Sequence, residues 1–471
     1  MKNFIMAWRN LWRNRRRTTI TVASVLFAVF FAILFRSLQI GSYDHMYKNA
    51  IESYSGYLQV QQKEWWDDKT VDNTFRWSAG LKSMLLEDEN VKGVVPRLES
   101  FMLASSGPST KGVMVLGIDP QEEQKMSGII DKKVKYRLTP AALERIRKDP
   151  AIPENVSETA SLFEGVSYTT DSRLLSDLGL DPEKDRGLLP ILSGHAGFKN
   201  GDIRLGQPGV WMGNRLAAFM ELGIGDTLVL VGQGYHGTTA AGIYEIKGII
   251  QQPLPDIDNK IVYLPVDIAQ QLFNAEGMLT SVALDLADKD DEAVRETSDR
   301  LNSLLPESTR MVTWFEMNEV MMQQMEADNK SGMIMIGILY LVIAFGVFGT
   351  VLMMTAERRR EFGVLVAVGM QKKKLAAVIS WEMVYIGLLG TLAGIVIGFI
   401  VISFGVDHPL VFKGEMAVMF EEYGFEPMIV FNPVDVYFLW QVFIVLLMVL
   451  ISLVHPVRKI LKLEVVNALR A

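Results

Sequence analysis

Four long apolar stretches constrain this chain more than any other feature of its sequence. We predict membrane-spanning helices at residues 18–40, 331–355, 375–404 and 434–455. About 20 helical residues cross the hydrocarbon core of a bilayer, and a helix satisfies its own backbone hydrogen bonds there. The fold class that follows is an α+β membrane protein, with four transmembrane helices and a large mixed α/β extracytoplasmic domain inserted between helices 1 and 2.

Basic residues near the ends of these stretches predict the orientation of the chain, because Lys and Arg that flank a span stay in the cytoplasm. They gather before the first span, between the second and third, and after the fourth: Arg9, Arg13, Arg15, Arg16, Arg17, Arg358, Arg359, Arg360, Lys372, Lys373, Lys374, Arg458, Lys459 and Lys462. The segment 405–433 instead carries five acidic residues against the single Lys413. We therefore expect residues 1–17, 356–374 and 456–471 in the cytoplasm, and residues 41–330 and 405–433 outside it.

The segment before the first span, residues 1–17, also shows helical periodicity. Phe4, Trp8 and Trp12 recur on one face, and Arg9 lies away from them. This pattern is typical of an amphipathic helix lying in the membrane interface, although a merely basic flank is the alternative. No small-x-small cleavage pattern follows the first span, so we expect it to be a retained anchor.

Composition excludes several classes of protein. The net charge is −7, whereas nucleic-acid binders normally present a basic face. The chain has no cysteine, which excludes disulfides, thiolate metal sites and cysteine nucleophiles, and its five histidines are scattered. It has no G-x-x-x-x-G-K-[ST] phosphate loop either. We therefore predict no catalytic residue, no metal site and no cofactor bound by this chain.

The segment between the first two spans, residues 41–330, mixes strand and helix patterns. Alternating and β-branched runs predict strands at residues 57–61, 113–118, 227–231, 244–250 and 281–286. Helical periodicity predicts helices at residues 141–148, 214–221, 266–273 and 292–304. Pro265 should stand in the first turn of the third of these helices. Residues 150–210, rich in Gly, Pro, Ser and Asp, predict an insertion or second lobe, and residues 41–55 and 314–329 should continue the membrane helices as two stalks.

The most specific segment is the loop between the second and third spans, residues 356–374. It holds apolar residues between two strongly charged ends, and Gly363 and Gly369 permit a close approach or a turn. A simple connection would need only a few polar residues. We therefore predict a short amphipathic helix that docks into a groove on a partner protein.

This loop resembles the E-R-x-x-E-[IF]-G-[IV]-L-x-A-[LIV]-G signature of the FtsX, MacB and lipoprotein-releasing (LolC/LolE) permeases. The matching positions are Glu357, Arg358, Glu361, Phe362, Gly363, Val364, Leu365, Ala367, Val368 and Gly369. The start AWRNLWRNRRRT, the tail HPVRKILKLEVVNALRA and the segments GVWMGNRLAAFMELGIGDTLVLV and DNKIVYLPVDIAQQLF also resemble that family. In the tail, Val465 stands where the family usually has a second proline.

The resemblance implies a permease subunit of a mechanotransmission-type ABC transporter in a bacterial inner membrane. In this family the loop is the coupling helix, which sits in a cleft of a separate ATPase subunit. The residues that would dock there are Glu357, Arg358, Glu361, Phe362, Gly363, Leu365, Ala367 and Gly369. Two ATPase copies, which bind ATP and Mg, and a second permease, identical or paralogous, are implied as partners, and a periplasmic chaperone or adaptor is a further possible partner.

The cargo that we expect is lipoprotein, released from the inner membrane when ATP hydrolysis in the partner moves the outer domain. One alternative is MacB-like export of small molecules or peptides with envelope partners. Another is FtsX-like transmembrane signalling to a cell-wall hydrolase, although the outer domain of such proteins is usually much smaller.

The third span contains a doubled G-x-x-x-G pattern. Gly390, Gly394 and Gly398 would let another membrane helix approach closely, although glycine is also simply common in membrane helices. Glu382 lies near the start of the same span, and we expect it at the membrane interface rather than in the hydrocarbon core.

Overall fold

The computed structural model describes residues 2–13, 15–107, 109–412, 416, 419–420 and 428–464. Lys413, Val465 and the rest of the tail after it lie outside the described residues. The chain divides into two compact units. The helical unit comprises Met1–His45, Val320–Val411 and Met428–Ala471, and the α/β unit comprises Met46–Glu319 and Phe412–Pro427.

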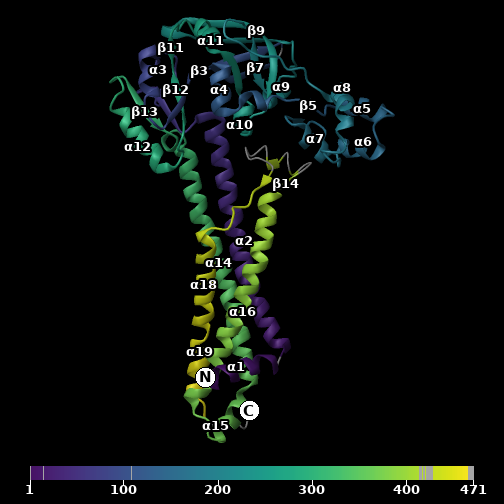
Figure 1. Ribbon diagram of the computed structural model, residues 1–471, viewed down its shortest axis with the longest axis vertical. Coiled ribbons are helices and arrows are strands. Elements are labelled where there is room, and N and C mark those ends of the chain that lie inside the picture. The colour runs from purple at the N-terminus through teal and green to yellow at the C-terminus, as the bar shows by residue number, and fades with distance from the viewer. Residues whose placement is uncertain are drawn as a thin grey trace. The chain divides into compact units, whose positions relative to one another are not determined.

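Long helices make up the helical unit and run side by side (Figure 1). They are α2 (Arg15–Ala50), α14 (Glu319–Glu357), α16 (Lys372–Asp407) and α18 (Val436–Ser452). By length and composition the described residues contain four candidate membrane spans, Thr18–Ser55, Glu319–Glu357, Lys372–Asp407 and Val436–Leu461. The predicted number of membrane helices is therefore confirmed. The shorter elements of this unit are α1 (Lys2–Arg13), α15 (Arg359–Ala367), α19 (Val454–Leu461), β14 (Leu410–Val411) and β15 (Met428–Ile429).

Helix α16 contacts α2 through its glycines. A Cβ atom added at Gly390 would lie 2.6 Å from the Cβ of Val25, and one at Gly394 would lie 2.8 Å from a backbone oxygen of α2. The contact is looser at Gly398, where the nearest atom, from Ile33, is 3.8 Å away. Small residues thus let the two helix backbones approach closely. This strengthens van der Waals packing between the helices, which matters in a membrane because the hydrophobic effect contributes little to helix association there.

A nine-stranded sheet forms the centre of the α/β unit (Figure 1). Across the sheet the strands are β13 (Thr309–Thr313), β1 (Leu58–Gln62), β12 (Ser281–Leu286), β3 (Val91–Ser106), β4 (Ser109–Ile118), β10 (Ile261–Pro265), β7 (Val210–Gly213), β9 (Thr239–Ile250) and β8 (Thr227–Gln233). Strand β8 also pairs with β3, so the strands from β3 to β8 close on themselves. Each predicted strand overlaps one of these.

The main hydrophobic core of this unit involves the closed part of the sheet. Leu98 and Met102 of β3, Val115 of β4 and Leu230 of β8 are buried there. The helices beside the sheet are α3 (Ala79–Leu86), α4 (Pro120–Ser127), α9 (Asn214–Phe219), α10 (Pro255–Asp258), α11 (Val266–Phe273) and α12 (Asp291–Asn302). A small two-stranded sheet joins β2 (Phe75–Arg76) to β11 (Met278–Leu279). Pro265 ends β10 and caps α11 instead of standing in its first turn.

Strand β3 is the longest strand of the sheet, and the sequence patterns did not predict it. Pro96 lies within it and interrupts the recognisable alternation. Proline lacks an amide donor and is tolerated in strands where no neighbour needs that donor. Here the pairing of β3 with β4 begins only at Arg97, so the segment before it is paired with β12 alone.

The predicted lobe has a hydrophobic core of its own but starts and ends earlier than residues 150–210. Its buried residues run from Tyr136 to Ala196. The elements are β5 (Tyr136–Arg137), α5 (Pro140–Lys148), α6 (Glu154–Ser161), β6 (Ser167–Tyr168), α7 (Asp171–Asp177) and α8 (Leu189–Ala196). The polar composition of residues 150–210 therefore does not coincide with the boundaries of the lobe.

The two predicted stalks differ from continuous α-helices. At the end of α2 the backbone changes to a π-helical turn, η1 (Ile51–Ser55), which ends at Gly56 with φ of 69°. The second stalk begins as the short helix α13 (Trp314–Met317) and is interrupted at Asn318, which has φ of −115° and ψ of 29°. The predicted helix 314–329 is therefore two helices, because the Asn318 side chain donates back to the Trp314 carbonyl and the backbone turns there.

Candidate functional site

The loop between α14 and α16 contains helix α15, whose ends are set by local backbone geometry. Arg358 leaves the helical conformation between α14 and α15, with φ of −91° and ψ of 7°. At the other end Gly369 has φ of 103°, a conformation that favours glycine. The amides of Gly369 and Met370 donate to the carbonyls of Val366 and Leu365 and so close the helix end.

One face of α15 packs on the protein itself. Phe362 is 1% exposed, Gly363 is buried and Leu365 is half-buried. The cluster around Phe362 comes from α16, α19 and the residues after α19: Leu375, Ala376, Ile379, Ile460 and Leu463. The docking role predicted for these three residues stays a prediction, and the structure shows Phe362 and Gly363 buried against the protein's own helices.

The opposite face of α15 is exposed. Val364 is 47% exposed and Val368, four residues later, is 84% exposed. Glu357 at the end of α14, and Ala367 and Gly369, are exposed as well. Val364 and Val368 stand at i, i+4 spacing and so share one side of the helix end. Sequence reasoning placed neither valine among the docking residues, although this spacing was a signal that could have found them.

A network of charged and polar side chains joins the start of α15 to α16 and α1. The Nη1 of Arg358 donates to Oε2 of Glu382 at 2.6 Å, and its Nε donates to Oε2 of Glu361 at 3.3 Å. Glu361 also accepts from Arg13 at 2.6 Å, and Glu382 accepts from Asn10 at 2.7 Å. Glu382 is only 2% exposed, so its carboxylate is buried within the protein and paired, while its depth in the membrane stays a prediction. A buried charge persists only when partners compensate its lost hydration.

Helix α1 is packed and not merely a basic flank. Leu11 is buried, and the rings of Phe4 and Trp8 meet the Tyr385 ring of α16 edge to face at 5.0 and 5.3 Å. Trp12 stays 57% exposed. The helix thus presents aromatic surface outward while it holds Asn10 and Arg13 in the network with α15.

A second buried charge cluster lies in the α/β unit, at the π-helical end of α2. Arg97 donates to both carboxylate oxygens of Glu123 at 2.7 and 3.0 Å and also to the carbonyl of Tyr54. The Tyr54 hydroxyl donates to Glu99 at 2.8 Å. Among the described residues the buried Nζ of Lys132 has no hydrogen-bond partner, and burial lowers the pKa of Lys132 to about 8. The sequence patterns did not predict this charge cluster, because its residues are far apart along the chain.

The contacts described above join α15 to the helices around it. Among the described residues no group of three or more His, Cys, Asp or Glu side chains is placed to hold a metal ion. The cluster around Phe362 and the network around Arg358 instead fix α15 to α16, α19 and α1. A displacement imposed on α15 must therefore act on those helices as well.

Taken together, four apolar helices, a packed helix between the second and third, and an α/β unit inserted after the first define the architecture of a polytopic membrane protein. Residues 333–465 match the family described as FtsX-like permease C-terminal. This part of the chain is an FtsX-like permease domain.

Named relatives are ABC transporter permeases. An uncharacterized ABC transporter permease of Mycobacterium tuberculosis is 25% identical over 232 residues, 48% of this chain and 26% of that protein. The lipoprotein-releasing system transmembrane protein LolC of Neisseria meningitidis is 20% identical over 229 residues, 47% of this chain and 54% of that protein. The permease YtrF of Bacillus subtilis is 35% identical over 80 residues, 17% of each chain. The matches thus span about a quarter to about half of the first two relatives.

Two solved structures are similar to the chain at a low level. The extracellular domain of the ABC-type transporter YknZ is 12% identical and covers 55% of this chain and 99% of its own, with a TM-score of 0.28. The periplasmic region of MacB from Actinobacillus actinomycetemcomitans is 11% identical and covers 58% of this chain and 94% of its own, with a TM-score of 0.30. At these scores neither likeness bears on what this chain does.

Proposed function

We propose that this chain is the permease subunit of a mechanotransmission-type ABC transporter and that α15 is its coupling helix. In this proposal α15 and both termini face the cytoplasm, and the α/β unit faces the outside of the inner membrane. A separate ATPase pair moves α15, and the α/β unit acts on lipoprotein to release it from the membrane.

The observation that carries the proposal is the division of α15 into two faces. Phe362 anchors one face in the protein's own cluster, while Val364 and Val368 expose apolar surface on the other. A helix that only connected two spans would need neither face. A helix that receives force from a partner needs a rigid backing and an exposed apolar contact, and α15 has both.

The backing extends beyond α15. Arg358 and Glu361 tie it to α16 and α1 through Glu382 and Arg13. Closure of an ATPase pair around two such helices would therefore move whole spans and not just a loop. Motion would reach the α/β unit through α2, whose π-helical end is held by Arg97.

Lipoprotein is the proposed cargo because the relative LolC belongs to a lipoprotein-releasing system. Export of small molecules or peptides with envelope partners, and signalling to a cell-wall hydrolase, are the competing outcomes. Mass spectrometry of the complex purified from its native membrane separates them: acylated protein supports release, and a co-purified envelope adaptor or hydrolase contradicts it.

The docking role of α15 is tested with Val368→Asp in the full chain. Burying a valine side chain against a partner contributes about 1.5–3 kcal/mol, so a charge in its place should reduce ATPase retention in the purified complex at least tenfold. The matched control is Leu162→Asp, which places the same charge at a 71% exposed apolar residue of the α/β unit.

Equal retention of a stoichiometric P-loop ATPase by Val368→Asp and the wild-type chain would reject the docking role. Phe362→Ala gives a further distinction. It should lower the thermal stability of the permease, because it removes a buried ring from the cluster behind α15.

A further inference from the structure

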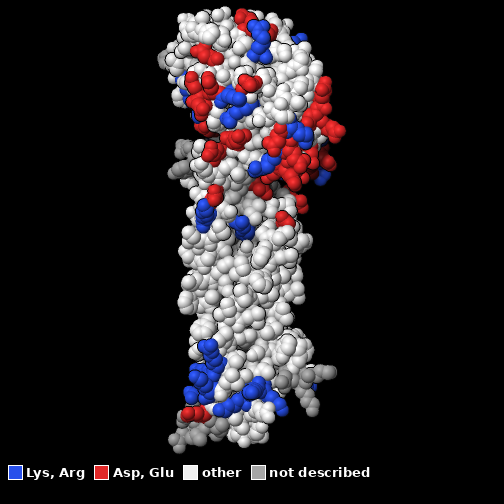
Figure 2. Space-filling model, turned by 90° about the vertical axis from the view of Figure 1, so that its left-hand side faces the viewer, with Lys and Arg blue, Asp and Glu red and all other residues white. Residues whose placement is uncertain are grey.

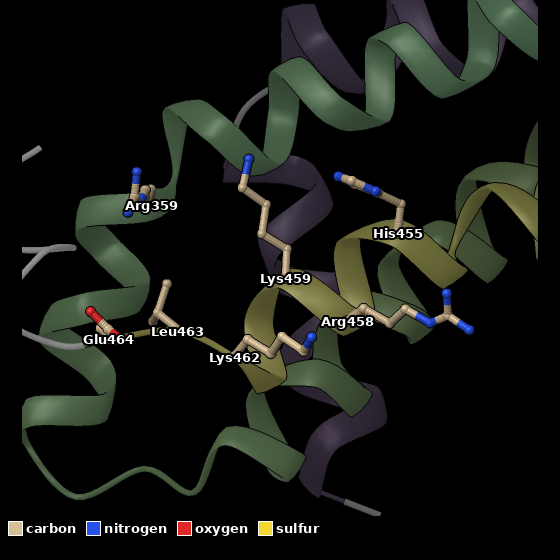
Figure 3. A pocket seen from close by; sticks show the side chains of 7 residues that line it. All are labelled: Arg359, His455, Arg458, Lys459, Lys462, Leu463 and Glu464. Atoms are coloured by element: carbon tan, nitrogen blue, oxygen red, sulfur yellow. The ribbon is translucent and has the colours of Figure 1, made fainter.

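A basic pocket lies beside α15 in the helical unit. Its volume is about 460 Å³, and its lining comes from the start of α15 and from α19 with the residues that follow it. The lining residues are Arg359, His455, Arg458, Lys459, Lys462, Leu463 and Glu464. Figure 3 shows Lys459 extending toward the space between Arg359 and His455.

The cations of α19 are arranged by the helix itself. Arg458 and Lys459 lie three and four residues after His455, and Lys462, just after the helix, lies four and three residues after them, so these side chains share one side of α19. Ile460, on another face, is buried in the cluster around Phe362. Because the apolar face of α19 packs in that cluster, its basic side chains line the pocket.

These cations lack compensation within the part of the chain that the structure describes. No ion pair is found there for Arg359, Arg458, Lys459 or Lys462, in contrast to Arg358, which has two acidic partners. Only Glu464 among the lining residues is acidic. Figure 2 shows Lys and Arg side chains gathered at this end of the helical unit and almost no charge along the middle of its helices.

We propose that this pocket binds a phosphate-bearing anion. Guanidinium groups bind phosphate through paired hydrogen bonds, and lysines contribute as point charges. A pocket of about 460 Å³ holds more than one phosphate group, so it suits a phosphate carried on a larger polar head. Two sources carry this chemistry: the headgroup of an anionic phospholipid and free phosphate or a soluble phosphate ester.

The bound anion would link two elements. Arg359 begins α15, whereas Arg458, Lys459 and Lys462 belong to α19 and the residue after it. A phosphate between them would neutralise their mutual repulsion and hold the coupling helix against the end of the fourth span. The proposal does not depend on an ATPase or a cargo, so it can fail while the proposed function holds.

The test uses the full chain in lipid nanodiscs and the double variant Lys459→Gln/Lys462→Gln. The matched control is Lys373→Gln/Lys374→Gln, which removes two exposed cations of α16 that do not line the pocket. In one arm the nanodiscs contain phosphatidylcholine and phosphatidylglycerol, and native mass spectrometry measures how much phosphatidylglycerol stays bound to the protein. The other arm uses phosphatidylcholine alone and measures binding of inorganic phosphate by ³¹P NMR.

A cation that meets an anionic headgroup contributes roughly a fivefold change in affinity, and of the substituted lysines only those of the pocket variant line the pocket. The pocket variant should therefore bind phosphatidylglycerol at least tenfold more weakly than wild type, and the control should differ by less than threefold. Loss in the lipid arm alone identifies a headgroup site, and loss of inorganic phosphate binding identifies a site for free phosphate. Equal behaviour of pocket variant and control in both arms overturns the proposal. Arg458→Gln provides an independent variant of the same pocket.

Discussion

Replacing Glu382 by leucine should reveal how firmly the helix that begins at Arg359 is held. The Arg358 and Glu382 side chains are 14% and 3% exposed, and their charged atoms are 2.6 Å apart. Without the Glu382 carboxylate, Arg358 keeps only Glu361 at 3.3 Å, and Asn10 loses its acceptor. In the variant, the largely buried guanidinium of Arg358 therefore has one carboxylate partner in place of two.

The size of the effect follows from that geometry. Removal of one partner of a buried ion pair destabilises by about 3–5 kcal/mol, whereas replacing both partners by apolar residues is often neutral. Because Arg358 retains Glu361 and some solvent, we expect the low end of that range for Glu382→Leu, about 3 kcal/mol. The double variant Arg358→Met/Glu382→Leu should recover most of this loss, and because Arg358→Met alone also leaves a buried charge unpaired, the coupling energy should be at least about 2 kcal/mol.

The assay is unfolding of the full chain in mixed micelles by SDS titration, followed by tryptophan fluorescence. Wild type, both single variants and the double variant complete the cycle. A parallel cycle pairs Glu382→Leu with Arg360→Met, which changes an exposed arginine of the same helix. Additivity within about 0.5 kcal/mol in the Arg358 cycle, or equal coupling in the Arg360 cycle, would refute the reasoning.

Three further predictions concern other parts of the chain. Gly394→Leu should lower the SDS midpoint, since a Cβ there lies 2.8 Å from a backbone oxygen of α2, whereas Gly337→Leu, with no atom within 4 Å, should not. The folded-state pKa of Lys132, about 8, lies below the ordinary 10.5, so the unfolded chain binds more protons between these values. The free energy of unfolding should therefore rise with pH across that window, by on the order of 3 kcal/mol, and urea titrations of Lys132→Met should show no such rise. Because the chain has no cysteine, an impermeant maleimide applied to spheroplasts should label Leu304→Cys but not Gln371→Cys; the reverse pattern would invert the proposed orientation.

Local patterns in the sequence were enough for the membrane part of the fold. A bilayer demands about 20 apolar residues in a helix, so four such stretches predict four spans without knowledge of any contact. The strands with clear alternation, such as the one near residues 281–286, were predictable for the same reason: each face of a strand meets one environment. Strand β3 was missed because Pro96 breaks that local signal, and only its pairing with β12 and β4 makes it a strand.

The sequence predicted that a helix lies at the candidate site, but it did not predict which residues of that helix are exposed. Charged ends, apolar residues and Gly369 indicated a short helix between the second and third spans, and α15 is that helix. Which of its apolar residues are available to a partner depends on α16 and α19, which no local pattern reveals. Phe362 and Val368 are both apolar members of the same loop, yet one is 1% exposed and the other 84%.

The sequence by itself therefore determined where this chain can meet a membrane and where a helix interrupts the spans, because hydropathy and backbone preference act over a few neighbouring residues. Only the tertiary structure decided that Glu382 is a buried partner of Arg358, and that the cations of α19 face a pocket beside Arg359. Burial and charge pairing depend on residues that are distant in sequence and adjacent in space.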